Sequence, residues 1–121
     1  MNQKRLLVID DDVAFRGFID EVSRTMDYDV VVTGNAEEFQ AGYFELKPNV
    51  IIMDMVMPGV DGLTLMHWLV EQKCTAKVIV ITGFNPSYAE MARTIASGGP
   101  LKSVLTLSKP VAITDLRAAL A

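Results

Sequence analysis

Short apolar runs rich in β-branched residues recur along the whole chain. Almost every position within a run is apolar, whereas a strand with one solvent-facing side would alternate between apolar and polar residues. Near-continuous apolar strands are typical of parallel sheets that are buried on both faces. The sequence therefore predicts five buried strands, at residues 6–9, 30–33, 50–53, 78–82 and 104–107.

The segments between these runs have helical spacing. The first segment places apolar residues on one face at intervals of three and four positions: Phe15, Phe18, Ile19, Val22 and Met26. Four further helices are predicted over residues 36–46, about 62–72, 86–97 and 113–120.

Capping residues set the expected ends of these helices. Asn35 is the expected N-cap of the second helix, and Asn85 of the fourth, whose first position is then a proline. Thr114 is the expected N-cap of the last helix. The fourth helix is predicted to end at two consecutive glycines, residues 98–99, within a surface loop over residues 97–103.

Strands and helices alternate strictly, and strict alternation predicts a parallel sheet with helices on both faces. Because crossover connections are right-handed, five such units favour the flavodoxin-like strand order 2-1-3-4-5. The predicted fold class is therefore α/β, a doubly wound five-stranded parallel sheet. The chain contains no repeat, linker or low-complexity tract, so residues 1–121 are predicted to form one domain.

Composition narrows the class of protein. Apolar residues make up 50% of the chain and charged residues 21%, which is too apolar for a disordered chain. The apolar runs are far shorter than the roughly 20 residues that a membrane-spanning helix needs. The single cysteine, Cys74, excludes an internal disulfide, and the net charge of −4 argues against binding to nucleic acid. We therefore expect a soluble, cytoplasmic domain without membrane or nucleic-acid partners.

Chemically active side chains follow four of the five predicted strands. They are carboxylates after the first and third strands, a hydroxyl after the fourth and an ammonium after the fifth: Asp10, Asp11, Asp12, Asp54, Thr82 and Lys109. In doubly wound sheets, ligands bind at the carboxyl ends of the strands. Clustered carboxylates repel one another, and a hard divalent cation with oxygen ligands relieves that repulsion. The sequence therefore predicts a Mg²⁺ site at this edge, completed by a phosphoryl group.

Asp54 is the candidate nucleophile of this cluster, because a tight turn rich in proline and glycine follows it. A carboxylate can attack phosphorus to form an aspartyl phosphate, and the transition state needs charge neutralisation more than acid–base catalysis. Mg²⁺ and Lys109 would neutralise that charge, while Thr82 would donate a hydrogen bond to a phosphoryl oxygen. Asp12 also has a structural interpretation, because an acid directly before a helix is a common N-cap.

Four pieces of the sequence resemble the receiver domain of two-component response regulators, the CheY-like family. They occur in the expected order: residues 6–12 (LLVIDDD), residues 51–62 (IIMDMVMPGVDG), Thr82-Gly83 and Ser108-Lys109-Pro110. The similarity covers essentially the whole chain. It implies that a histidine kinase or a histidine phosphotransfer protein phosphorylates Asp54, and that the domain signals by a conformational change. It also implies a cis peptide bond before the proline of the last piece.

The resemblance further implies how Mg²⁺ would be held. Asp11 and Asp54 would bind it directly, together with the backbone carbonyl of Val56, and Asp10 would act through a water molecule. The implied activity is Mg²⁺-dependent self-phosphorylation and self-dephosphorylation on Asp54, not the turnover of an enzyme. We expect a monomer or a weak dimer, whose output domain or docking partner the sequence does not identify.

Three features depart from the family's pattern, on the surface that usually transmits the signal. Thr106 replaces an aromatic residue, Gly83 replaces an alanine, and residues 97–103 replace a compact Gly-Ala turn. Thr106 is too small to act as an aromatic rotamer switch. We therefore expect the loop formed by Thr82, Gly83 and Phe84 to move instead.

Self-dephosphorylation is expected to be slow. Hydrolysis needs a water molecule in line with the phosphorus. In the family, the residues two after the phosphorylated acid and two after the threonine flank that path. Here they are Val56 and Phe84, whose apolar side chains cannot orient a water molecule.

Two other functions fit part of this pattern. A small phosphatase of the haloacid-dehalogenase type would also use a strand-1 aspartate and Mg²⁺, and Asp10 and Asp12 match the start of its motif. Ala14, however, stands where that motif has threonine or valine. A degenerate receiver would be a binding module that no longer accepts phosphate. The presence of every expected phosphorylation residue weighs against it: Asp54, Thr82 and Lys109.

Three further residues are interpreted structurally. His67 has no second histidine with which to share a metal, and Cys74 has no partner for a disulfide. Trp68 lies off the apolar stripe of the third helix, so we expect it to be partly exposed.

Overall fold

The structure, a computed structural model, describes residues 3–57, 60–83 and 87–121 and contains a central parallel sheet. The strands of this sheet are β1 (Arg5–Ile9), β2 (Asp29–Thr33), β3 (Val50–Asp54), β6 (Lys77–Thr82) and β7 (Ser103–Ser108). They pair in the order β2-β1-β3-β6-β7, and every pair is parallel. Counted along the chain, these are strands 1 to 5, so the predicted order 2-1-3-4-5 is confirmed.

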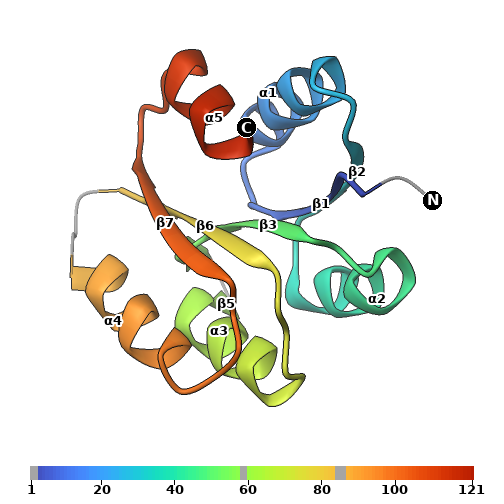
Figure 1. Cartoon of the computed structure of the whole chain (residues 1–121). Helices are drawn as coiled ribbons and strands as arrows, with labels where there is room; N and C mark the ends of the chain where they lie inside the picture. Colours follow the sequence, from blue (N-terminus) through green and yellow to red (C-terminus); the bar gives the residue numbers. More distant parts are fainter. Residues whose placement is uncertain (1–2, 58–59, 84–86) are drawn as a thin grey trace.

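Helices cover both faces of the sheet. On one face lie α1 (Val13–Thr25) and α5 (Ile113–Leu120), and on the other lie α2 (Ala36–Leu46), α3 (Gly62–Glu71) and α4 (Ser87–Ala96) (Figure 1). This three-layer arrangement confirms the predicted α/β class. Among the described residues, no helix is long and apolar enough to span a membrane.

Each face of the sheet has its own apolar core, because successive residues of a strand point to opposite faces. In β1, Leu6 and Val8 belong to the core beneath α1 and α5, whereas Leu7 and Ile9 belong to the core beneath the other three helices. All four side chains are fully buried. Burial on both faces explains why the strand sequences are continuously apolar.

Of the three predicted N-caps, one is confirmed, one is wrong and one is not tested. Asn35 caps α2 and accepts a hydrogen bond from a backbone N–H of its first turn. The prediction for Thr114 is wrong: α5 begins at Ile113, and its N-cap residue Ala112 makes no side-chain hydrogen bond. Thr114 already has helical backbone geometry, and a capping side chain must stand on an extended residue before the first turn. The predicted start of the fourth helix at residues 85–86 lies outside the described residues.

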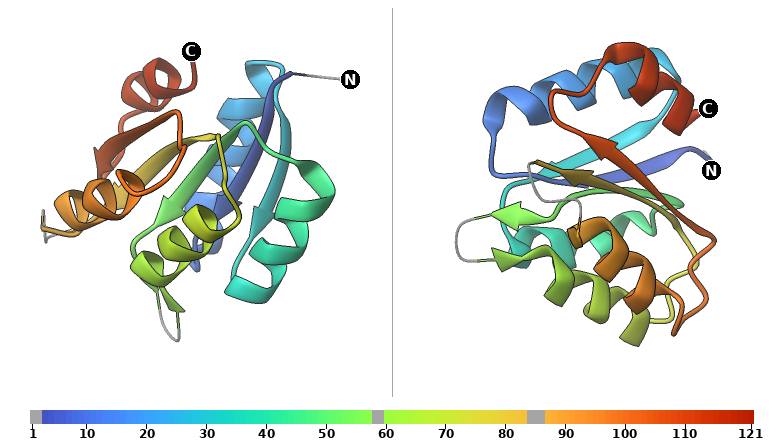
Figure 2. Two further views of the ribbon diagram at one scale, coloured as in Figure 1. Left: turned by 60° about the horizontal axis from the view of Figure 1, so that its bottom comes forward. Right: turned by 90° about the vertical axis from the view of Figure 1, so that its left-hand side faces the viewer.

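A small second sheet was not predicted from the sequence. It pairs β4 (Val56–Met57) with β5 (Val60–Asp61) in antiparallel fashion. The hairpin projects beyond one end of the main sheet, and the C-terminus lies at the other end (Figure 2). Strands of two residues are too short to produce an apolar pattern, so only the folded chain reveals them.

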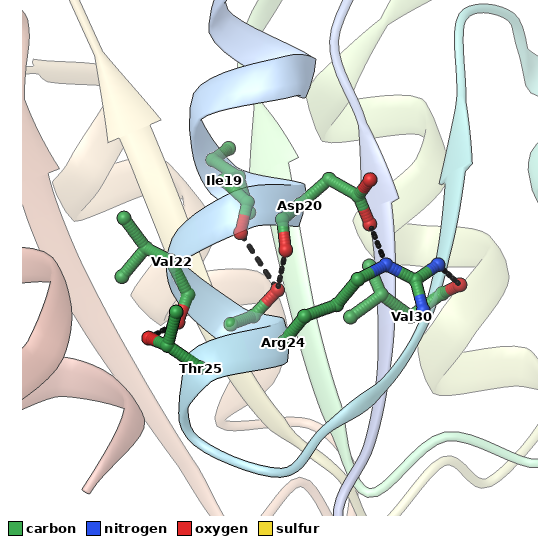
Figure 3. Close-up of polar contacts among 7 residues, drawn as sticks. Ile19, Asp20, Val22, Arg24, Thr25 and Val30 are labelled. Carbon is green, nitrogen blue, oxygen red and sulfur yellow. Dashed lines mark hydrogen bonds and ion pairs between the residues drawn. The ribbon is translucent and has the colours of Figure 1, made fainter.

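The last turn of α1 is tied to the neighbouring strand β2 by an arginine. Nε of Arg24 lies 2.8 Å from Oδ1 of Asp20, and its Nη2 donates to the carbonyl oxygen of Val30 at 3.5 Å (Figure 3). The ion pair is exposed and contributes only about 0.3–0.5 kcal/mol. Ser23, buried in the same turn, donates its hydroxyl to the carbonyl oxygen of Ile19 at 2.6 Å. Of these contacts, the hydrogen bond to Val30 links α1 to β2, and the other two lie within the helix.

Candidate functional site

Three carboxylates meet at the carboxyl ends of β1 and β3. Asp10 and Asp11 follow β1, and Asp54 is the last residue of β3. The two strands pair up to Ile9 and Met53, so their ends lie side by side. One oxygen from each carboxylate lies within 4.8 Å of the other two. Asp10 (1% exposed) and Asp54 (7%) are buried, while Asp11 faces solvent.

Asp12, the third acid of the run, has a structural role. Its Oδ1 accepts hydrogen bonds from the backbone N–H groups of Ala14 at 3.0 Å and Phe15 at 3.2 Å, so it is the N-cap of α1. Its own N–H donates to Oδ1 of Asp10 at 2.9 Å. The cap therefore also orients the carboxylate of Asp10.

The ammonium of Lys109 reaches into the cluster from the loop after β7. Its Nζ lies 3.3 Å from Oδ2 of Asp10 and 3.4 Å from Oδ2 of Asp54. The same Nζ lies 4.7 Å from the ring centroid of Phe15, within cation–π range. The peptide bond between Lys109 and Pro110 is cis, as the resemblance implied. From the helical spacing, the sequence predicted Phe15 only as part of the apolar face of a helix. It did not predict the contact with Lys109, which lies 94 positions later in the chain.

Burial raises the pKa of Asp10 above the ordinary value for a carboxyl group. The hydrogen bond from Asp12 lowers this pKa, the charge of Asp54 raises it, and the ammonium of Lys109 lowers it. Burial alone would lower the pKa of Lys109, but attraction to Asp10 and Asp54 outweighs this effect, and the pKa is raised. Lys109 is therefore charged at neutral pH, and its ammonium contacts the carboxylates of Asp10 and Asp54.

The donor set of this cluster fits a small divalent cation. Oδ2 of Asp10 is buried and accepts no hydrogen bond from the described part of the chain, although it lies within ion-pair distance of Lys109. The cluster holds three carboxylates, two of them buried, and the single ammonium of Lys109 leaves an excess of negative charge that a divalent cation would neutralise. Exposure of Asp11 leaves one side open to water, which suits Mg²⁺ because it keeps several water ligands.

Two further predicted site residues, Thr82 and Val56, lie at the end of β6 and the start of β4. Thr82 ends β6, is 4% exposed, and accepts a hydrogen bond on its carbonyl oxygen from the N–H of Lys109 at 2.9 Å. Val56 begins β4, two positions after Asp54. Their roles, as phosphoryl hydrogen-bond donor and as metal ligand, stay predictions. The expectation of slow dephosphorylation also rests on the side chains of Val56 and Phe84, which lie outside what the structure describes.

A glycine lets the chain pass close behind Asp54. The N–H of Gly62 donates to the carbonyl oxygen of Met55 at 3.2 Å. A Cβ atom at Gly62 would lie 2.7 Å from Cα of Met55 and 3.0 Å from the carbonyl oxygen of Asp54. Both are backbone atoms, so any other residue would push α3 away from the end of β3. Gly62 thereby fixes the position of the backbone that carries the candidate nucleophile.

Thr106, which stands where the family has an aromatic residue, joins β7 to α4. Nη2 of Arg93 and Oγ1 of Thr106 are hydrogen-bonded at 2.9 Å. Gly83, the second departure, is exposed, and a Cβ built on it would meet no atom within 4 Å. Movement of the loop through Phe84 stays a prediction, because Phe84 lies outside the described residues.

The three residues with a structural interpretation lie as follows. His67 is exposed on α3, and Cys74 is buried after the same helix. Trp68 is half-buried, as expected, but it is not isolated: its ring centroid lies 5.2 to 6.3 Å from three rings of α2, those of Phe39, Tyr43 and Phe44. The sequence indicated a single aromatic residue, because the two helices meet only in the folded chain.

Comparison with known proteins agrees with the fold. Residues 6–121 match the response regulator receiver domain family. The chemotaxis protein CheY of Listeria monocytogenes is 32% identical over 82 residues, which cover 67% of this chain and 69% of that protein. The transcriptional regulatory protein LiaR of Bacillus subtilis is 34% identical over 75% of this chain, which spans only 44% of LiaR.

Solved structures share the architecture. A response regulator from Burkholderia pseudomallei, solved with a phosphorylated aspartic acid, a calcium ion and citrate, superposes with a TM-score of 0.81 at 26% identity over 98% of this chain and 66% of that one. CheY4 of Vibrio cholerae superposes with a TM-score of 0.83 over 97% of this chain and 95% of that one, and at 18% identity it supports the fold alone. With its sheet order, its carboxylate cluster and these matches, the chain belongs to the response regulator receiver domain family.

Proposed function

We propose that this domain accepts a phosphoryl group on Asp54 in a Mg²⁺-dependent reaction and signals through the resulting conformational change. The observation that carries the proposal is the meeting of three carboxylates with the ammonium of Lys109 at one end of the sheet. Buried carboxylates that repel one another lower the stability of the fold, so their presence at this position is not explained by folding alone. The phosphorylated aspartic acid and calcium ion of the Burkholderia pseudomallei regulator support the same chemistry.

Each residue has a defined part in the proposed reaction. A carboxylate oxygen of Asp54 attacks phosphorus as the bond to the leaving group breaks, and the leaving group departs with the bonding electrons. Lys109 stabilises negative charge on the phosphoryl oxygens, and the hydroxyl of Thr82 donates a hydrogen bond to one of them. Asp11, Asp54 and the carbonyl of Val56 would hold Mg²⁺ directly, and Asp10 would hold it through water. When bound, Mg²⁺ would neutralise charge on the transferring group.

The proposal is tested by the intact mass of the chain after incubation with acetyl phosphate. We expect the mass of one phosphoryl group to be gained with Mg²⁺ and not with a chelator, and peptide mapping to locate it on Asp54. A chain that stays unmodified while binding Mg²⁺ would be a degenerate receiver. Sustained turnover of a simple phosphate ester would instead support the phosphatase.

Asp11→Ala is expected to weaken Mg²⁺ binding at least about tenfold, because even the loss of a group that only supports a metal ligand costs about 10- to 100-fold. Asp11 is exposed, so stability without Mg²⁺ should change by less than about 0.5 kcal/mol. Titration of Mg²⁺ followed by calorimetry, with thermal unfolding in chelator, measures both quantities. Unchanged Mg²⁺ affinity would remove Asp11 from the proposed ligand set.

The proposed protein phosphodonor, a histidine kinase or a histidine phosphotransfer protein, has an apolar surface to contact beside the site. A cavity of about 560 Å³ adjoins Lys109 and is lined mostly by apolar residues: Phe15, Phe18, Gly83, Pro110 and Val111. Asp54 is 7% exposed, so a protein that brings a phosphohistidine to it must cover this neighbouring surface. Acetyl phosphate is small enough to reach Asp54 without contacting this apolar surface.

Phe18→Ala is therefore expected to slow transfer from a phosphorylated histidine phosphotransfer domain at least about tenfold, as the loss of an aromatic anchor does in other interfaces. Phosphorylation by acetyl phosphate should proceed at the rate of the unchanged chain, which also shows that the variant is folded. Phe44→Ala is the matched control, because Phe44 is an exposed phenylalanine on α2. Equal slowing with both donors would mean that Phe18 acts on the site itself and not on docking.

A further inference from the structure

A cavity lies at the other end of the sheet, by the amino ends of the strands. Its volume is about 370 Å³, and its walls come from the start of β1, the end of α2 with the loop to β3, and the turn between α3 and β6. Pockets that hold small organic ligands have volumes of roughly 300–1,000 Å³. The charged, amide and aromatic residues of its lining are Arg5, Tyr43, Phe44, Lys47, Asn49 and Lys73.

The charge of this lining is opposite to that of the whole chain. Three of its residues are cationic and none of them is acidic, although the chain has a net charge of −4. Lys47 and Lys73 are exposed, and within the described residues their ammonium groups form no ion pair or hydrogen bond. A concave surface lined by one sign of charge concentrates ligands of the opposite sign.

The third cation, Arg5, is held in place at the wall. Its Nε donates to the carbonyl oxygen of Lys47 at 2.9 Å, and its backbone N–H donates to Oδ1 of Asn49 at 2.8 Å. Because the arginine is already ordered, a ligand that uses it loses less conformational entropy on binding.

Both free lysines stand at backbone positions that usually carry glycine. Lys47 has φ of 51° and Lys73 has φ of 56°, in the left-handed region. Each follows a helix, where glycine is common because it has no Cβ atom to clash. A lysine there would also interact favourably with the helix dipole. The two explanations, helix stabilisation and ligand binding, make different predictions for a glycine variant.

Aromatic rings form another part of the wall. Phe44 is 57% exposed, and its ring meets those of Tyr43 and Trp68 at interplanar angles of 81° and 82°. Burial, together with a hydrogen bond to Cys74, raises the pKa of Tyr43 to about 12, so Tyr43 adds no negative charge to the cavity. An exposed ring beside cationic groups can stack on a flat unsaturated ligand.

We infer that this cavity binds a small anion that carries a flat aromatic ring, the chemistry of a nucleoside monophosphate. Lys47, Lys73 and Arg5 bind the anionic group, and Phe44 contacts the ring. The site is separate from Asp54, at the opposite end of the strands, and binding there involves no covalent step. The inference about this cavity therefore does not depend on whether Asp54 accepts a phosphoryl group.

Calorimetric titration of the full chain with AMP tests the inference, with adenosine and inorganic phosphate as partial ligands. We expect AMP to bind at least about tenfold more tightly than either, because only AMP uses both the charge-assisted hydrogen bonds and the ring contact. No binding of AMP at millimolar concentration would overturn the inference. So would equal affinity for AMP and inorganic phosphate, because the ring would then make no contribution.

Glycine variants separate binding from helix stabilisation. Lys73→Gly is expected to weaken AMP binding about tenfold without lowering the melting temperature, because glycine suits the left-handed backbone. Phe44→Ala should weaken AMP binding about tenfold and leave the affinity for inorganic phosphate unchanged. Arg117→Gln removes one exposed positive charge from α5 and should not alter AMP affinity. A loss of AMP affinity in Arg117→Gln as large as in Lys73→Gly would show that net charge alone governs binding and would overturn the inference.

Discussion

Asp54→Asn is expected to leave the chain unphosphorylated under every condition in which the unchanged chain gains a phosphoryl group. Oδ2 of Asp54 lies 3.4 Å from Nζ of Lys109, and one of its oxygens lies within 4.8 Å of the carboxylates of Asp10 and Asp11. An amide keeps the shape of the side chain but has no charged nucleophilic oxygen. Intact mass after incubation with acetyl phosphate and Mg²⁺ measures the result.

Asp12→Asn is the matched control for this substitution. It removes one carboxylate from the same end of the sheet, but Asp12 is a helix cap, and asparagine caps a helix as well as aspartate does. This variant should still be phosphorylated. If Asp54→Asn gained the same mass as the unchanged chain, another residue would be the phosphoacceptor and the proposed site would be wrong.

The second large effect is expected from Lys109→Gln, which should slow phosphorylation by acetyl phosphate about 100- to 1,000-fold. Losing one preorganised group that stabilises charge in a transition state typically costs this much. Lys109 contacts the carboxylates of both Asp10 and Asp54, and the ring of Phe15 lies against its ammonium. Glutamine keeps a polar side chain but carries no positive charge. Rates are measured by intact mass over time at saturating Mg²⁺.

Lys109→Gln should also lower stability in a way that depends on Mg²⁺. Without the cation, two buried carboxylates lose their ammonium, which costs about 1–3 kcal/mol. The lysine side chain is 32% exposed, so the loss should lie at the lower end of that range. Mg²⁺ should recover much of it, because the cation neutralises the same carboxylates. Thermal unfolding with Mg²⁺ and with chelator measures the difference.

Lys102→Gln is the control for both effects, because Lys102 is an exposed lysine beside the opposite end of β7. It should alter neither the phosphorylation rate nor the response of stability to Mg²⁺. If Lys109→Gln were destabilised equally with and without Mg²⁺, the lysine would support the fold through contacts outside the carboxylate cluster. A phosphorylation rate close to that of the unchanged chain would contradict its role in the reaction.

The sequence by itself determined the strands, their order and the edge of the sheet where the carboxylates meet. Strands buried on both faces must be apolar at nearly every position, and this signal is local, so each of the five apolar runs lies within an observed strand. Caps such as Asp12 and Asn35 are also local, because the capping side chain bonds to the turn directly after it. The sequence also predicted that one cluster contains Asp10, Asp54 and Lys109, because the carboxyl ends of parallel strands lie at the same edge of the sheet.

The tertiary structure alone decided features that depend on residues far apart in the chain. Phe15 lies against Lys109, Trp68 packs on rings of α2, and Arg5 lines a cavity with Lys47 and Lys73. None of these contacts has a periodicity or a motif, because the partners come from different elements whose relative positions follow from packing the whole core. Two local features were also not predicted correctly from the sequence. Helix α5 begins at Ile113 without a side-chain cap, so no capping residue marks its start, and the strands of the β4–β5 hairpin are too short to leave an apolar pattern.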